Sequence, residues 1–77
     1  MVPIVPVQCW IARTALGWTV RDLAHAAEVS LSTVRRFERG GAVRVSTAET
    51  IQRTIEKAGV IFIDANDGGP GARLCKG

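Results

Sequence analysis

The sequence predicts a mainly α-helical fold in which four short helices are followed by a short pair of β-strands. Three observations support this prediction. Residues that cap helices stand ahead of apolar residues spaced three and four apart. Glycines follow three of the four helical segments, where they are typical of helix ends. Beyond the last of these, Gly59, a run of mostly β-branched apolar residues is typical of a strand.

Length and composition predict a single domain. The chain has 77 residues, of which 47% are hydrophobic. A chain of this length buries about 60% of its unfolded surface, which is enough for one thin core. We therefore expect one domain over residues 1–77, with a helical part at residues 7–59 and a β segment at residues 60–77.

The first helix is expected to run from Pro6 or Val7 to about Leu16. The two prolines within residues 1–6 exclude a regular helix there, whereas proline suits the first turn of a helix. Gly17 is expected to end the helix. The apolar face is predicted to contain Ile11, Ala12, Ala15 and Leu16.

The second and third helices have clear start signals. Thr19 is a good N-cap, and Asp22 three residues later can accept from the free amides of the first turn. Ser30 caps the third helix, which is expected to run to Arg39 and to stop at the glycine pair 40–41. The residues expected to face the core are Val20, Leu23, Ala24 and Ala27 in the second helix, and Val34 and Phe37 in the third.

The fourth helix and the strand pair complete the prediction. Residues 46–49 have the pattern of a capping box, with a glutamate three residues after a serine. Gly59 suits the position after the last turn. Val60–Ile63 is predicted as a strand, and residues 72–74 return as its partner after a turn-rich segment. The apolar stripe of the fourth helix is predicted to contain Ala48, Ile51, Ile55 and Ala58.

The net charge of the chain is concentrated in one segment. The chain carries a formal net charge of +3. Residues 30–45 contain four arginines and one acid, whereas the other residues contain six basic and six acidic side chains. A basic segment in an otherwise neutral chain indicates an anionic partner, although arginines are also common on solvated helix faces.

Other features argue against membrane proteins, metal sites and enzymes. No apolar run approaches the roughly 20 residues that a membrane helix needs. A disulfide framework needs more cysteines than Cys9 and Cys75, which we interpret as free thiols in a reducing cytoplasm. The one histidine, His25, lies on the polar face of the second helix, and no nucleophile or acid stands at the spacing from it that a catalytic site would need. We expect no catalytic activity, no metal and no cofactor.

The second and third helices, joined by a turn at residues 28–30, have the spacing of a helix-turn-helix. In residues 18–24, 27–30 and 32–40 the chain resembles the Cro/repressor-type helix-turn-helix family, also called the XRE family. The resemblance covers roughly residues 9–59 and implies a fold that binds double-stranded DNA. The chain departs from the family pattern at Val20, where glutamine is common, and at Glu28, where glycine is common.

The resemblance also implies which residues contact DNA. The groove-facing positions are Leu31, Ser32, Arg35 and Arg36, and the candidates for phosphate contacts are Thr19, Arg39 and Arg44. Arginine can donate two hydrogen bonds to guanine, and phosphate contacts position a protein without reading sequence. Leu31 also suits a core or dimer contact, and Thr19 also suits its role as a helix cap. Glu38 is expected to orient a neighbouring arginine or to cap a structural element.

We interpret the chain as a sequence-specific transcriptional regulator, a repressor, that acts as a homodimer. One recognition helix reads only a few base pairs, so a second copy is needed for selectivity. A strand that is apolar on both faces suits a contact between chains, so the predicted dimer interface is Val60, Ile61, Phe62 and Ile63. Alternatively, the helices and residues 2–7 cover this strand within one chain. A second class of function is an antitoxin-like module whose C-terminal strands hold a partner protein.

Overall fold

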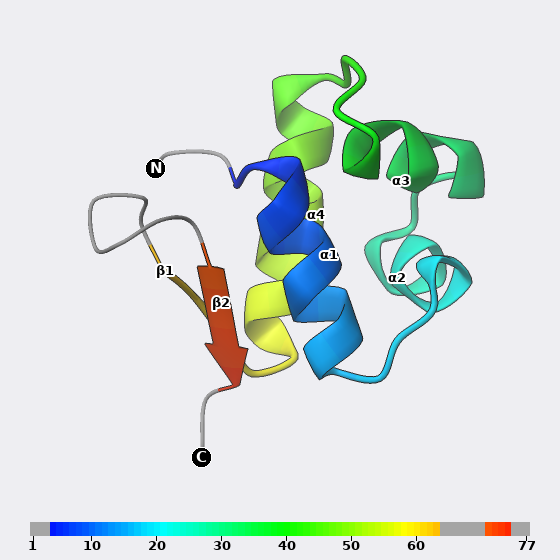
Figure 1. The fold of residues 1–77 in the computed structure, drawn as a ribbon. Coiled ribbons are helices and arrows are strands. Elements are labelled where there is room, and N and C mark those ends of the chain that lie inside the picture. The colour runs from blue at the N-terminus through cyan, green and yellow to red at the C-terminus, as the bar shows by residue number, and fades with distance from the viewer. Residues whose placement is uncertain (1–3, 64–70, 75–77) are drawn as a thin grey trace.

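The structure is a computed structural model that describes residues 4–63 and 71–74 of the chain. It confirms the mainly α-helical fold with a short strand pair after the last helix (Figure 1). Cys75 and the predicted turn at residues 64–70 lie outside the described residues. In chain order the elements are the helices α1 (Pro6–Ala15), α2 (Val20–Ala27), α3 (Leu31–Glu38) and α4 (Val45–Lys57), and the strands β1 (Val60–Ile63) and β2 (Gly71–Leu74).

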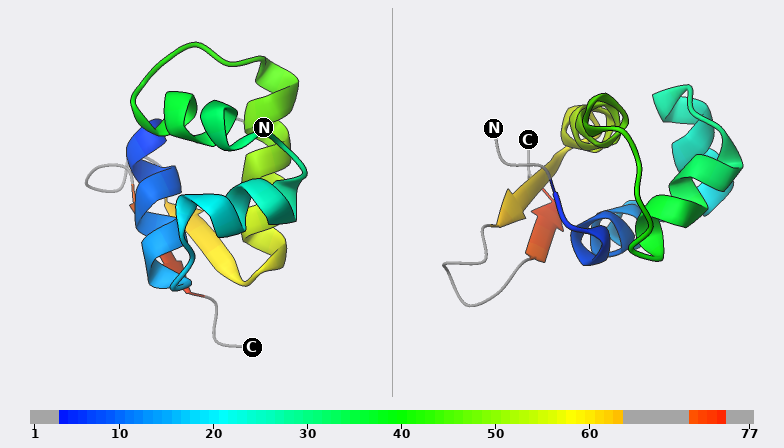
Figure 2. Two further views of the ribbon diagram at one scale, coloured as in Figure 1. Left: turned by 90° about the vertical axis from the view of Figure 1, so that its right-hand side faces the viewer. Right: turned by 90° about the horizontal axis from the view of Figure 1, so that it is seen from above.

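Helices α1 and α4 form the centre of the molecule. Helices α2 and α3 lie on one side of this pair, and the two strands lie on the other side (Figure 2). The strands are antiparallel, with Val60 opposite Leu74 and Ile63 opposite Gly71. Strand β2 packs mainly on α1, and β1 packs on α4. The hairpin and α3 are therefore on opposite sides of the central helix pair.

The core lies between the four helices and is closed by β1. Most of the predicted core positions of α2, α3 and α4 are buried, which confirms the predicted stripes in these helices. Val20 is half-buried and packs against the core. The largest fully buried side chains are Leu23, Ile51, Ile55, Val34 and Cys9.

The predicted caps of α2 and α3 are confirmed. The Thr19 hydroxyl accepts a hydrogen bond from the Asp22 amide at 3.1 Å, and the Asp22 carboxylate accepts from the Thr19 amide at 2.9 Å. The Ser30 hydroxyl accepts from the Thr33 amide at 3.1 Å. The pKa of Asp22 is lowered, chiefly because the Thr19 amide donates to the charged carboxylate. These local bonds set where both helices begin.

The predicted start of α4 is wrong. The helix begins at Val45, after Arg44 as N-cap residue, and no side chain caps it. The Ala48 amide donates to the Arg44 carbonyl at 3.0 Å, so Ser46 lies inside the first turn. Residues 44–46 are exposed, so water can satisfy the free amides and no capping box is required. At the other end, Ala58 is exposed rather than part of the stripe, because the helix ends at Lys57.

The buried face of α1 also differs from the prediction. Ala12 is buried as expected, but Ala15 is exposed, and the other buried residues are Gln8 and Cys9. Gln8 is buried at the start of the helix, where its side-chain oxygen accepts from the Val5 amide at 2.9 Å. A buried polar residue of this kind breaks the apolar pattern from which the face was predicted.

Candidate nucleic-acid interface

Helices α2 and α3 form a compact pair joined by three residues, Glu28, Val29 and Ser30. Glu28 has a φ of 58°, in the left-handed region that favours glycine. The Val29 amide donates to the Ala24 carbonyl at 3.0 Å and closes the end of α2. The turn therefore forms with glutamate at the position where the resemblance implies glycine, at the cost of some backbone strain.

An ion pair fixes the C-terminal end of α3 to α1. The Arg13 guanidinium donates from Nε and Nη2 to the two carboxylate oxygens of Glu38, at 2.8 and 3.0 Å. Arg13 also donates from Nη1 to the Trp18 carbonyl at 3.0 Å. The bond to Glu38 is the main reason that the pKa of Arg13 is raised. Glu38 thus orients an arginine, as expected, but one that lies 25 residues earlier in the chain.

The thiol of Cys9 lies beside the same carboxylate. Its Sγ donates to Glu38 at 3.5 Å, and burial raises the pKa of the thiol far above its ordinary value. Cys9 therefore stays protonated and contributes to the packing between α1 and α3. The prediction of a free thiol is confirmed for this residue.

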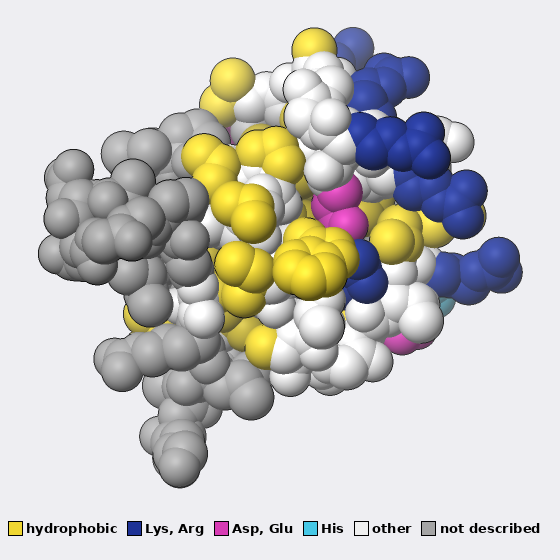
Figure 3. All heavy atoms as spheres, viewed as in Figure 1, with side chains coloured by type: hydrophobic (Ala, Val, Ile, Leu, Met, Phe, Trp, Pro, Cys, Tyr) yellow, Lys and Arg dark blue, Asp and Glu magenta, His cyan; other side chains and the backbone are white. Residues whose placement is uncertain are grey.

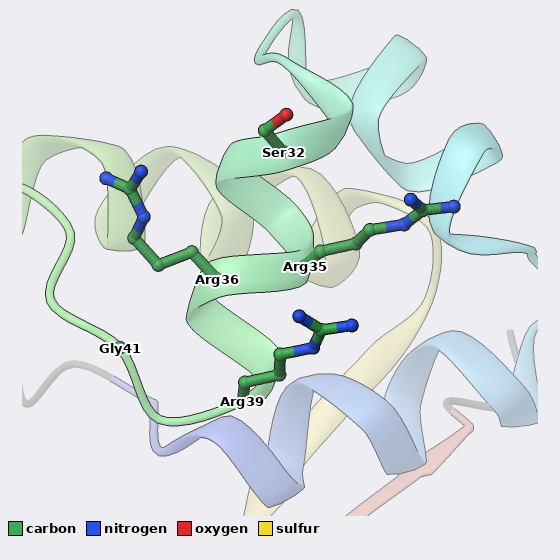
Figure 4. Close-up of a pocket in the computed structure, with 5 residues that line it drawn as sticks. All are labelled: Ser32, Arg35, Arg36, Arg39 and Gly41. Carbon is green, nitrogen blue, oxygen red and sulfur yellow. The ribbon is translucent and has the colours of Figure 1, made fainter.

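The exposed face of α3 carries a concentration of arginines. Its opposite face is buried through Val34 and Phe37. The exposed side chains line an open hollow of about 470 Å³ together with the loop that follows the helix (Figure 4). Figure 3 shows Lys and Arg side chains gathered along the edge of the molecule formed by this side. The residues that line the hollow are Ser32, Arg35, Arg36, Arg39 and Gly41.

The structure brings most of the predicted contact residues to this side of the molecule. Leu31 is half-buried and packs against the core, so only part of its side chain is free for another contact. Thr19 is exposed while its hydroxyl oxygen caps α2, and a hydroxyl that accepts one bond can still donate another. Arg44 is exposed at the start of α4, next to amides that no side chain caps. Gly41, which the sequence analysis missed, lines the hollow with the arginines.

Two acidic residues of the helix-turn-helix make hydrogen bonds within the protein. Glu38 is bound by Arg13, and Asp22 by the start of α2. The charge of Glu38 is thus balanced by Arg13 rather than by the exposed arginines of α3. Among the described residues no group of three or more His, Cys, Asp or Glu side chains could hold a metal ion. In the same part of the chain, no helix is long and apolar enough to cross a membrane.

Comparison with known proteins agrees with this geometry. A family model described as helix-turn-helix matches residues 11–58, which include most of α1 and all of α2, α3 and α4. No curated protein matches the chain. The matched segment covers more than half of the chain, and within it lie the capped helix pair and its turn. The chain therefore belongs to the helix-turn-helix family of the Cro/repressor type, a family of DNA-binding transcription regulators.

Proposed function

We propose that this chain binds double-stranded DNA at specific sequences and represses transcription, with α3 in the major groove. The observation that carries the proposal is the two-sided character of α3, which buries its apolar face and exposes a serine and two arginines over one hollow, with Arg39 just after the helix as a third. A helix fits the width of the major groove, where arginine distinguishes guanine from the other bases. A protein that occupies a promoter can exclude the polymerase, so binding is sufficient for repression. We place the protein in the cytoplasm, in the same compartment as the DNA that it binds.

Base contacts and phosphate contacts are divided between different residues in this proposal. Arg35, Arg36 and Ser32 reach base edges, and the exposed part of Leu31 contacts a thymine methyl group. Thr19, Arg39 and Arg44 contact phosphates on either side of the groove. Two positions support this division: Arg39 lines the hollow at the end of α3, and Arg44 is exposed at the start of α4, three residues after Gly41.

Replacement of single arginines separates the two kinds of contact. Arg36→Ala should reduce affinity for the preferred sequence by about 1–3 kcal/mol and relax the preference at one base pair. Arg44→Ala should weaken binding to all sequences by a similar factor, because phosphates carry no sequence information. Competition binding against duplexes changed at one base pair each measures both effects. A uniform loss in both variants would make Arg36 a phosphate contact instead.

We further propose that the protein binds DNA as a homodimer, and that the C-terminal hairpin takes part in the contact. The side chains of β1 alternate between the core and the outer face of the hairpin. Val60 is 3% exposed and Phe62 packs against the core, whereas Ile61 is 41% exposed on the outer face. The side chain of Ile63 lies outside the described residues. Of the predicted interface residues that are described, Ile61 is therefore the most exposed.

The position of α3 restricts which surface can form the dimer. The outer face of the hairpin points away from α3 (Figure 2), so a two-fold contact there would direct the two α3 helices in opposite directions. A contact at the side of the molecule leaves both α3 helices facing one duplex. Helix α1 packs against β2, and its exposed face includes Val7 and Trp10, which are 45% and 53% exposed. Figure 3 shows hydrophobic side chains gathered over this face of α1. We assign the contact to the edge of β2 and this face.

Two exposed apolar residues offer a matched test of this assignment. Trp10→Glu should convert the dimer to a monomer, because two charges would be brought together in a contact without water. Ile61→Glu is the control and should leave the dimer intact. Light scattering at tens of micromolar measures the mass of each variant. A monomeric wild-type protein, or a dimer broken only by Ile61→Glu, would contradict the assignment.

The antitoxin-like alternative is not favoured. The matched family consists of DNA-binding regulators, and the match spans the helices rather than the strands. The test above also bears on this alternative, since a chain that is monomeric on its own would be expected of a module that awaits a partner protein.

A further inference from the structure

Two adjacent glycines with different surroundings follow Arg39, the C-cap residue of α3. Gly40 has a φ of 84°, and a Cβ added to it would meet no atom within 4 Å. The φ of Gly41 is outside the left-handed region, but its added Cβ would lie 2.6 Å from Cγ of Arg36. The same Cβ would lie 3.1 Å from the carbonyl oxygen of Arg36. The φ of Gly41 does not itself require glycine, but a Cβ at this residue would collide with the side chain of Arg36 in its present position.

The bonds at the end of α3 hold the loop against this side chain. The Gly41 amide donates to the Arg36 carbonyl at 2.8 Å, and the Gly40 amide donates to the Phe37 carbonyl at 3.0 Å. These are the two bonds of a Schellman motif, in which the chain folds back over the last turn of a helix. Figure 4 shows Arg36 on the side of this loop, directed away from Arg35 and Arg39.

We propose that Gly41 is a positioning residue for DNA recognition, because its lack of a side chain lets the stem of Arg36 lie against the loop and aims its guanidinium into the groove. The proposal rests on the proposed function, in which Arg36 reads a base. It adds a residue that determines specificity without contacting DNA.

The position of Cγ explains why a single methyl group at residue 41 would matter. Within a helix a long side chain has two main χ1 values, and χ1 fixes where Cγ lies. A Cβ at residue 41 excludes the present position of Cγ, so Arg36 has to take the other value or displace the loop. Either change moves the guanidinium at the far end of the stem. A bidentate contact with guanine requires two donors in one plane at fixed separation, so it is lost by such a movement.

The two glycines provide a matched pair of variants. Gly41→Ala should lower affinity for the preferred duplex by roughly 5- to 150-fold, which is the range for one bidentate base contact. It should also relax the sequence preference at the same base pair at which Arg36→Ala relaxes it. Gly40→Ala should lower the melting temperature, because alanine is strained at its φ, and should leave base preference unchanged. In the Arg36→Ala background, adding Gly41→Ala should change affinity by less than about twofold, because the side chain through which it acts is gone.

The measurements are dissociation constants for a panel of duplexes changed at one base pair each, with thermal unfolding of every variant. An unchanged base preference in Gly41→Ala, beside a relaxed one in Arg36→Ala, would overturn the positioning role. Equal losses from Gly41→Ala with and without Arg36 would overturn it too, since a purely structural effect behaves in that way.

A measurement without DNA separates this proposal from the proposed function. In the free protein, nuclear Overhauser contacts are expected between the Gly41 α protons and the methylene protons of Arg36. Their absence would overturn the packing even in a protein that binds DNA well. If the contacts are present but the wild-type protein binds no duplex, the proposed function fails, and the role of Gly41 in recognition fails with it.

Discussion

Replacing Glu38 by alanine is expected to lower the free energy of unfolding by about 3 kcal/mol, the lower end of the range for breaking a buried ion pair. The lower end applies because the side chains of Arg13 and Glu38 are not fully buried: they are 13% and 11% exposed. The variant leaves the Arg13 guanidinium without its two carboxylate acceptors and the Cys9 thiol without its partner. Urea-induced unfolding followed by circular dichroism measures the loss.

Two controls define what the loss of Glu38 means. Glu38→Gln keeps one acceptor for Arg13 but removes the charge, so its stability should fall between those of wild type and Glu38→Ala. Glu56→Ala removes an exposed glutamate that accepts one long bond of 3.4 Å from the side-chain amide of Gln52, and it should cost no more than about 1 kcal/mol, the typical net value of one hydrogen bond. Equal stability of Glu38→Ala and wild type would show that α3 does not depend on this ion pair.

Raising the salt concentration from 50 to 200 mM is expected to weaken DNA binding by about a factor of 10³. In residues 30–45 each chain has four arginines, and the one acid among them is bound by Arg13. If each chain of the dimer neutralises about three phosphates, the affinity falls with salt with a log–log slope of about −5, because condensed counterions are released. Titrations at several salt concentrations give the slope.

Single variants test where this salt dependence originates. Arg44→Ala should make the slope shallower by about one unit per chain, because one phosphate contact is removed. Lys57→Ala is the matched control: it removes an exposed charge at the opposite end of α4 and should leave the slope unchanged. An affinity that does not vary with salt would contradict an interface made of arginine–phosphate contacts.

Features that depend on residues three or four apart were predictable from the sequence. The caps at Thr19 and Ser30 each accept from the backbone amide three residues later, so both hydrogen-bond partners lie within one short stretch of sequence. The exposed set on α3 was predictable for the same reason, since the positions of Val34 and Phe37 decide which face is buried. The strand pair followed from composition, because β-branched residues come directly after Gly59.

Features that depend on distant residues were not predictable. Cys9 is buried against Glu38, 29 residues later, so the periodicity of α1 alone could not give its buried face. The partner of Glu38 was hidden for the same reason, because Arg13 lies in a different helix. The start of α4 was wrong because an exposed helix end leaves its amides to water, and a capping pattern at Ser46 is then unused.

Gly41 shows a further limit of sequence patterns. A glycine pair after a helix predicts a turn, and Gly40 with its positive φ fulfils that role. Nothing in the pattern indicates that the second glycine adjoins the side chain of an arginine five residues earlier. A relation of this kind depends on the rotamer of Arg36 and on how the loop folds back, and both become visible only in three dimensions.

Selection of duplexes from a random pool tests the central claim, sequence-specific DNA binding through α3, most directly. Sequencing of the retained duplexes should give an inverted repeat whose half-sites lie about 10 base pairs apart, one turn of DNA, as expected for two α3 helices related by a two-fold axis. The same selection with Arg36→Ala should lose the preference at one symmetric pair of positions. A retained pool with no enriched sequence, or an enriched sequence that Arg35→Ala and Arg36→Ala leave unchanged, would contradict the claim.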